Sequence, residues 1–265
     1  ILKKLNYIDH FIIGDGEEPL YNLLMNKEDA NVDQEQFAIL EDINQQPFSD
    51  YSDYDWNLYE VKRLPMYGSR GCVRRCTFCD VYKLWKKFKL RDAETVFQEM
   101  LYQIELTGVS DFYFRDSLIN GNITQFRKLI RLIANYNESA QEKIKWRSFF
   151  IFRPQTQIVE EDWEFIKKSG AYELMVGVES FTESIRDHMK KKFSNADMDY
   201  SLDMAKKYGI NLYLMIIIGY VTETEDDFQQ SLKWLEDHVK YAPNPISAIS
   251  VGGTMILTAL SDLYL

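Results

Sequence analysis

The 265-residue sequence contains few cysteines and histidines and no long apolar run. A membrane-spanning helix needs roughly 18 or more consecutive apolar residues, whereas the longest apolar stretch, residues 212–219, has only the length of a strand. The polar N-terminal residues do not resemble a signal peptide. These absences predict a cytoplasmic protein without a membrane partner.

Basic residues are in the minority. Lys and Arg total 31 against 41 Asp and Glu, which gives a formal net charge of -10. A broad nucleic-acid face needs clustered Lys and Arg, so this balance argues against one. The sequence also lacks a Walker phosphate loop and a GxGxxG dinucleotide fingerprint, because the glycine pair Gly14 and Gly16 is too short for either. Nucleotide binding through these two motifs is therefore excluded.

All three cysteines of the chain, Cys72, Cys76 and Cys79, lie within eight residues. A disulfide framework prefers an even number of cysteines and a secreted context. Structural zinc needs four protein ligands, and no fourth cysteine or nearby histidine pair is present. An iron-sulfur cluster is normally held by four cysteines, so three would leave one iron open for a substrate or cofactor. The spacing favours such a cluster over a zinc site or three unrelated thiols.

The spacing CxxxCxxC, with Phe78 before the last cysteine and Gly68 and Gly71 before the first, resembles the signature of the radical S-adenosylmethionine (radical SAM) superfamily. The resemblance implies that Cys72, Cys76 and Cys79 hold a 4Fe-4S cluster whose open iron chelates S-adenosylmethionine. It also implies reductive cleavage of that cofactor to a 5′-deoxyadenosyl radical, which abstracts hydrogen from a substrate. A reductase such as flavodoxin or ferredoxin would supply the electron.

Helical and extended patterns alternate after the cysteine loop. Three times a helix ends at a glycine that is followed by an apolar strand, at Gly108, Gly170 and Gly209. Such alternation predicts βα units and a parallel sheet. We expect six strands, at residues 64–69, 111–114, 145–152, 173–178, 211–219 and 246–251.

The family resemblance implies the same α/β fold class, a partial (β/α)6 TIM-like barrel of the radical SAM type. In parallel barrels the chemistry lies at the carboxyl ends of the strands. The cysteine loop follows the first expected strand directly. Its position along the chain therefore agrees with the barrel hypothesis, independently of the number of cysteines.

The resemblance also implies cofactor contacts near the cysteines and after the second strand. Phe78 would lie against the adenine, although an aromatic residue in a core would look the same in the sequence. Asp116 would contact the methionyl group, and an ordinary loop acid is the alternative. Lys191 would pair with the cofactor carboxylate, although three adjacent lysines are more often a solvated face.

Two further strand ends carry candidate cofactor contacts. Glu179 and Ser180 end the fourth strand, where a buried carboxylate needs a partner, and the ribose hydroxyls or the ammonium group of the cofactor would provide one; a helix N-cap is the alternative. Gly219 ends the fifth strand and would let the backbone approach the adenine. The glycines before Thr254 are a weaker candidate of the same kind.

We expect two parts, an N-terminal appendage and connector over residues 1–60 and the radical SAM core over residues 61–265. Gly14 to Glu17 resembles the segment that closes a Rossmann-like domain in the cobalamin-binding branch of the superfamily. Cobalamin is a further cofactor that this resemblance allows, but Asp9 and His10 have the wrong spacing for a cobalamin motif. We also expect the chain to be a fragment at both ends, since it does not begin with Met and stops after an apolar segment.

Three functions compete at this point. The first is a radical SAM enzyme of unknown substrate, with methyl transfer and methylthiolation among the open reactions. The second is a non-catalytic iron-sulfur electron-transfer protein, which would need a fourth cluster ligand. The third is a zinc-stabilised binding module. No residue of the sequence is assigned a catalytic role, and the oligomeric state is not predicted.

Overall fold

The computed structural model describes residues 7–27, 32–33, 38–239 and 245–252. The chain forms two compact units, Ile1–Pro47 and Phe48–Leu265. The expected boundary after residue 60 stays a prediction. No helix within the described ranges is long and apolar enough to cross a membrane.

The described residues of the first unit form the α-helix α1 (Glu17–Leu24) and the 3-10 helix η2 (Ile43–Gln45). Before α1, the described chain forms a single parallel bridge between Gly14 and Ala38. Next to this bridge the carboxylate of Asp15 is buried and accepts a hydrogen bond from the Leu40 amide at 2.7 Å. Local polar contacts of this kind therefore hold the described part of the unit.

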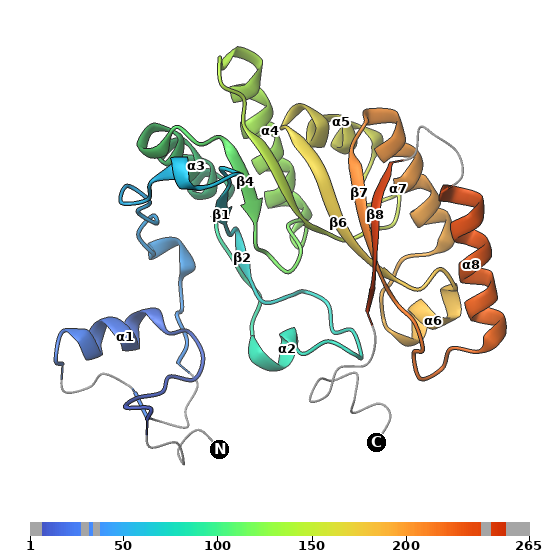
Figure 1. Cartoon of the computed structure of the whole chain (residues 1–265), viewed down its shortest axis with the longest axis horizontal. Helices are drawn as coiled ribbons and strands as arrows, with labels where there is room; N and C mark the ends of the chain where they lie inside the picture. The colour runs from blue at the N-terminus through green and yellow to red at the C-terminus, as the bar shows by residue number, and fades with distance from the viewer. Residues whose placement is uncertain (1–6, 28–31, 34–37, 240–244, 253–265) are drawn as a thin grey trace. The chain divides into compact units, whose positions relative to one another are not determined.

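The second unit is built on a six-stranded, all-parallel sheet in which the strands follow one another in chain order (Figure 1). This confirms the expected partial (β/α)6 barrel. A small antiparallel pair, β2 (Ser69–Arg70) and β3 (Lys89–Leu90), flanks the cysteine loop and was not expected. The six parallel strands are β1 (Leu64–Met66), β4 (Asp111–Phe114), β5 (Lys145–Phe150), β6 (Ala171–Glu179), β7 (Asn211–Ile217) and β8 (Ile246–Gly252).

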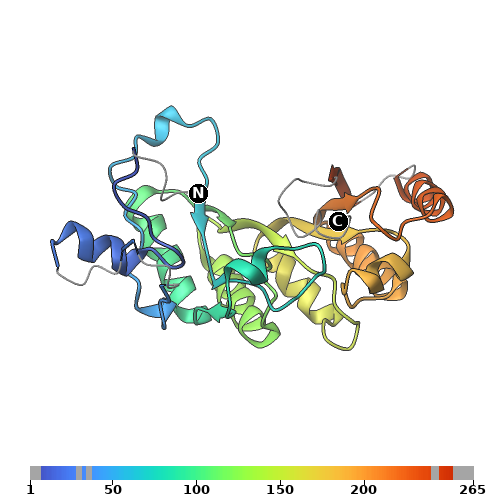
Figure 2. The ribbon, with the colours of Figure 1, turned by 90° about the horizontal axis from the view of Figure 1, so that it is seen from below.

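Helices connect the strands and lie along one side of the sheet (Figure 2). Two of the three glycines that were expected to end helices, Gly108 and Gly209, are left-handed C-caps with φ of 70° and 62°. The structure also contains two short helices that were not expected, α2 (Val81–Leu84) and α6 (Glu183–His188), and one 3-10 turn, η3 (Trp56–Leu58). The longer helices are α3 (Ala93–Thr107), α4 (Ile123–Ser139), α5 (Glu160–Lys168), α7 (Asn195–Tyr208) and α8 (Glu225–Val239).

The two faces of the sheet differ in chemistry. On one face alternate strand residues such as Phe112, Trp146 and Leu214 are fully buried and form one core with the helices. The residues between them along the strands, such as Tyr113 and Arg147, project from the opposite, concave face. Because the helices fill only one side, the concave face is left to carry polar and functional groups.

Candidate active site

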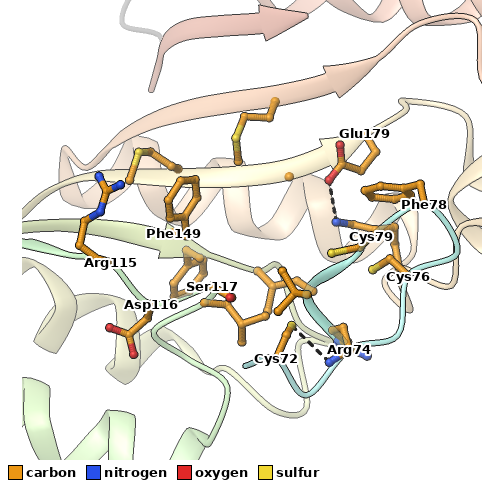
Figure 3. Close-up of a pocket in the computed structure, with 18 residues that line it drawn as sticks. Cys72, Arg74, Cys76, Phe78, Cys79, Arg115, Asp116, Ser117, Phe149 and Glu179 are labelled. Carbon is orange, nitrogen blue, oxygen red and sulfur yellow. Dashed lines mark hydrogen bonds and ion pairs between the residues drawn. The ribbon is translucent and has the colours of Figure 1, made fainter. Parts of the chain in front are cut away.

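A cavity of about 340 Å³ opens at the carboxyl ends of the strands, and all three cysteines line it (Figure 3). This is where a parallel barrel is expected to carry its chemistry. Four of the other sequence-predicted residues, Phe78, Asp116, Glu179 and Lys191, also line the cavity. The remaining lining residues include Arg74, Arg115, Ser117, Phe149, Met175, Gly177 and Met215.

Hydrogen bonds hold the cysteine loop in a fixed conformation. The amide of Cys79 donates to the carbonyl of Cys76 at 3.2 Å, and the amide of Thr77 donates to Met189 at 3.3 Å. The Thr77 hydroxyl lies 2.8 Å from the hydroxyl of Tyr220, a residue that is 2% exposed. The loop is therefore tied to the segment after α6 and to the end of the fifth parallel strand.

The three thiols differ in burial. Cys76 is buried and the other two are partly exposed. Burial raises the pKa of the Cys72 and Cys76 thiols, while the positive charge of Lys191 acts in the opposite direction on both. A cluster binds thiolates, so positive charge beside the loop favours the form that binds it.

The donor set fits a cluster better than a single zinc ion. Among the described residues, no three His, Cys, Asp or Glu side chains converge on one metal ion. An iron-sulfur cluster takes one thiolate on each of several irons, so its cysteines need only face a common cavity. Cys72, Cys76 and Cys79 meet that condition.

Lys191 and Glu179 form an ion pair beside the cysteines. The Lys191 Nζ lies 3.0 Å from Glu179 Oε1, and their side chains are 7% and 12% exposed. The same ammonium group lies 5.9 Å from the centroid of the Phe78 ring. Lys191 is therefore buried in the site, and the alternative of a solvated lysine face is wrong for this residue.

Unusual backbone conformations position the side chains of Glu179 and Lys191. Glu179 itself has a φ of 67°, and Lys190 and Lys192, on either side of Lys191, have φ of 63° and 61°. Left-handed conformations are costly for residues other than glycine and are retained mostly at functional sites. A Cβ atom at Gly177 would lie 2.4 Å from Glu179 Oε1, so any larger residue here would force the carboxylate to shift from its position in the pair.

Phe78 is both a core residue and a wall of the cavity. It packs against a small buried cluster of Ile185, Met189 and Tyr220. Its ring also lines the cavity. Both sequence interpretations of Phe78 are thus compatible, and its contact with an adenine ring stays a prediction.

Asp116 has a structural task that the sequence did not reveal. Its carboxylate accepts hydrogen bonds from the Gly68 amide at 2.9 Å and from the Ser69 hydroxyl at 2.5 Å. Figure 3 shows the carboxylate turned away from the cysteines. Burial raises the pKa of Asp116 to about 6, against the hydrogen bonds that lower it. Asp116 holds the chain where it enters the cysteine loop, and its contact with a methionyl group stays a prediction.

Ser180 and Gly219 do not line the cavity. The Ser180 hydroxyl accepts a hydrogen bond from the Thr182 amide at 3.1 Å, and its carbonyl accepts one from Arg186 at 2.8 Å. Gly219 has a φ of 76°, and its amide donates to Glu223. Their contacts with a cofactor stay predictions. Of the two glycines before Thr254, Gly252 ends β8 and the next one lies outside the described residues.

The sequence analysis missed the residues that shape the far end of the cavity. Arg115 follows β4 directly, while Phe149, Met175 and Met215 project from β5, β6 and β7. The alternation along each strand would have identified them, because Asp111, Tyr113 and Arg115 must share one face. None of these residues belongs to a recognisable sequence motif, so a search for motifs does not find them.

Comparisons with known proteins also point to a radical SAM enzyme. A family model described as the Radical SAM superfamily matches residues 66–235. Cytidylyl-2-hydroxyethylphosphonate methyltransferase of Streptomyces wedmorensis is 25% identical over 183 residues, which cover 65% of this chain and 32% of that enzyme. The anaerobic magnesium-protoporphyrin IX monomethyl ester cyclase of Synechocystis is 23% identical over 274 residues, which cover 95% of this chain and 52% of that enzyme. The chain thus spans about a third to a half of the length of these relatives.

The fold also matches a solved structure. The radical S-adenosylmethionine methyltransferase TsrM from Kitasatospora setae, with cobalamin and a 4Fe-4S cluster bound, superposes with a TM-score of 0.71. The match covers 95% of this chain and 52% of that chain at 15% sequence identity, so it shows a shared fold. The family model covers more than half of the chain and includes the cysteine loop. The chain therefore belongs to the radical SAM superfamily.

Proposed function

We propose that this chain binds a 4Fe-4S cluster through Cys72, Cys76 and Cys79 and binds S-adenosylmethionine beside it. When bound and reduced, the cluster supplies the electron that cleaves S-adenosylmethionine to methionine and a 5′-deoxyadenosyl radical, which then abstracts hydrogen from a substrate. The observation that carries this proposal is the convergence of all three cysteines on one cavity at the carboxyl ends of the strands.

The residues around the cysteines support cofactor binding. S-adenosylmethionine carries an ammonium group, a carboxylate and an adenine ring. Glu179 and Lys191 offer a carboxylate and an ammonium group at the same cavity, and Phe78 offers an aromatic face. We propose that the pair opens to bind the opposite charges of the cofactor, because each charge of the pair would then keep a partner.

Cobalamin has less support in this chain. The TsrM structure contains it, but no described residue of this chain forms a recognised cobalamin motif. The electron donor that we propose is a small reductase such as flavodoxin or ferredoxin. A cytoplasmic location follows as a proposal, since thiolates that hold a cluster need a reducing compartment.

The direct test is anaerobic reconstitution of the chain with iron and sulfide, followed by reduction with dithionite and an assay for 5′-deoxyadenosine. We expect an iron-sulfur absorption spectrum and formation of 5′-deoxyadenosine. Cys76→Ala should lose both, whereas the loop variant Val73→Ala, at a residue that is 43% exposed and contributes no ligand, should retain both.

The alternatives give different results in the same experiment. A cluster without cleavage would contradict the proposal and favour an electron-transfer protein. A colourless protein that contains zinc would favour the zinc-stabilised module. Full cleavage by Cys76→Ala would show that the radical forms without this ligand, which the proposal does not allow.

A further inference from the structure

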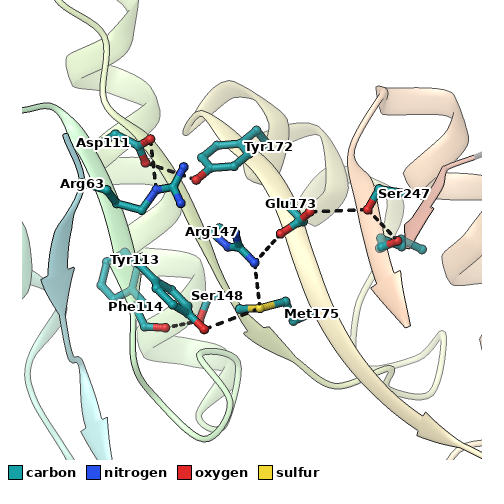
Figure 4. Close-up of polar contacts among 11 residues, drawn as sticks. Arg63, Asp111, Tyr113, Phe114, Arg147, Ser148, Tyr172, Glu173, Met175 and Ser247 are labelled. Atoms are coloured by element: carbon teal, nitrogen blue, oxygen red, sulfur yellow. Dashed lines mark hydrogen bonds and ion pairs between the residues drawn. The ribbon is translucent and has the colours of Figure 1, made fainter. Parts of the chain in front are cut away.

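Toward the amino ends of the strands, the concave face carries arginines that are matched by carboxylates (Figure 4). Arg63 lies 3.1 Å from Asp111, and Arg147 lies 2.6 Å from Glu173. The Tyr172 hydroxyl also donates to Asp111, at 3.3 Å. At this level of the barrel each arginine therefore has a counter-charge of its own.

Arg115 breaks this pattern. It follows β4 and lines the same cavity as the cysteines, and its side chain is exposed there. Its guanidinium carbon lies 4.5 Å from the centroid of the Tyr113 ring, and that of Arg147 lies 5.0 Å from the same ring. No carboxylate in the described part of the chain lies within ion-pair distance of Arg115. Arg115 is held in place by stacking while its hydrogen-bond donors remain available.

The other charges that line the cavity do not neutralise Arg115. Arg74 is a second cation and lies at the cysteine end, where its amide donates to Cys72 Sγ at 3.4 Å. Lys191 and Glu179 satisfy each other. The Asp116 carboxylate is next in the chain but binds Gly68 and Ser69. At the end away from the cysteines the cavity therefore has an uncompensated positive charge at Arg115. Figure 3 shows this residue at the opposite end from the three cysteines.

The space between Arg115 and the cysteines is mainly apolar, with the Ser117 hydroxyl as a polar group in it (Figure 3). Phe149, Met175 and Met215 line it. Methionine and aromatic side chains pack against apolar groups of many shapes, because these contacts need no hydrogen-bond geometry. A ligand that fills the cavity would thus meet a charged anchor at one end and an apolar wall before it reaches the cysteines.

From this arrangement we propose that Arg115 binds an anionic group of the substrate, a carboxylate or a phosphonate-type group. The apolar part of the substrate then lies along Phe149, Met175 and Met215, directed toward the cysteines. Arginine suits this task because its planar fork pairs with such anions through two hydrogen bonds, and stacking on Tyr113 orients that fork in advance. The assignment of the ligand as substrate rests on the proposed function.

The test uses small aromatic probes and fluorine NMR on the purified chain saturated with S-adenosylmethionine. Para-fluorobenzoate and para-fluorophenylphosphonate are the two anionic probes. Para-fluorobenzamide has a similar shape but no charge and serves as the neutral control. We expect both anions to bind more tightly than the amide. Arg115→Met should weaken anion binding by about tenfold or more, since a charge-assisted hydrogen bond is lost.

Two further variants sharpen the test. Arg131→Met is the matched control, because Arg131 stacks over Phe165 at 4.7 Å on the helix side of the sheet and should leave probe binding unchanged. Arg115→Lys keeps the charge but not the fork, so it should retain part of the affinity. The tighter of the two anionic probes then identifies the class of anion.

Three outcomes would overturn the proposal. Arg115→Met could bind the anions as well as the wild type does, or the neutral amide could bind as well as benzoate. Alternatively, the anions could bind only when S-adenosylmethionine is left out while Arg115→Met loses affinity for S-adenosylmethionine, which would make Arg115 a ligand of the cofactor. Probe binding does not depend on cleavage, so a protein that forms no 5′-deoxyadenosine but binds anions through Arg115 would refute only the proposed function.

Discussion

Lys191 Nζ lies 3.0 Å from Glu179 Oε1, and the two residues come from segments with left-handed backbone on both sides of the contact. The pair is buried beside Cys76, which is itself 7% exposed. Burying two charges is favourable only if each keeps its partner. The unfavourable free energy of the left-handed backbone and of charge desolvation thus arises next to the three cysteines. There the two charges are available to bind a cofactor.

Removing one member of the Lys191–Glu179 pair should destabilise the folded chain. Lys191→Met leaves the Glu179 carboxylate buried without its counter-charge, and we expect a loss of roughly 3 kcal/mol in the free energy of unfolding. Urea unfolding measures this loss. The double variant Lys191→Met, Glu179→Gln should recover part of it, because no unpaired charge remains. If the double variant is less stable than the single variant, the pair does not explain the cost.

Gly177→Ala should disturb the same pair from the backbone. The added Cβ would lie 2.4 Å from Glu179 Oε1 and 3.2 Å from Lys191 Nζ, so the carboxylate has to move. We expect weaker binding of S-adenosylmethionine to the reconstituted chain, with the iron content unchanged because the cysteines do not move. Calorimetric titration measures the affinity. Gly16→Ala is the control, since nothing lies within 4 Å of its added Cβ.

The sequence predicted the barrel well because its signals are local and repeated. Glycine after a helix and an apolar strand after the glycine recur at Gly108, Gly170 and Gly209, and all six parallel strands are present. The end of α4 at Ser139 has no such local signal, since no glycine follows the helix there. This helix end is instead held by a contact beyond the helix, because the buried Asn137 side chain bonds both the amide and the carbonyl of Ile144.

The site was predictable only where residues have a fixed spacing along the chain. The three cysteines form such a pattern, whereas Arg115, which follows β4, and Met175, in β6, line one cavity only because of the arrangement of the strands. The orientation of Asp116 toward Gly68 depends on a contact across 48 residues. Contacts between residues so far apart in the sequence depend on how the strands and loops pack. A single sequence without an alignment carries no direct signal of that packing.

Tyr220→Phe should test how the cysteine loop is anchored. The substitution removes a buried hydroxyl that lies 2.8 Å from Thr77 Oγ1 and 2.9 Å from His188 Nδ1. We expect a loss of about 1 kcal/mol in the free energy of unfolding, measured in urea. Tyr59→Phe, at a tyrosine that is 45% exposed, should show no comparable loss. Equal effects of the two substitutions would mean that the hydroxyl of Tyr220 does not stabilise the loop.

The buried carboxyl of Asp116 should give stability a characteristic dependence on pH. Its pKa is raised from 3.8 to about 6 in the folded chain, because burial disfavours the charged form. The folded state therefore holds the proton more tightly than the unfolded state, and stability from this group falls as pH rises through about 6. Asp116→Asn cannot titrate. The free energy of unfolding of the wild type minus that of the variant should thus decrease by up to about 3 kcal/mol between about pH 4 and about pH 7.

Urea unfolding of both proteins at several pH values in that interval measures this difference, and contributions from all other titrating groups cancel in it. The hydrogen bonds from Gly68 and Ser69 favour the charged carboxylate and oppose the effect of burial. A difference that grows with pH would mean that these hydrogen bonds dominate and that the pKa of Asp116 lies below its ordinary value. Asp116 would then bind the entry to the cysteine loop as a carboxylate over the whole interval, and the loop would become more stable as pH rises.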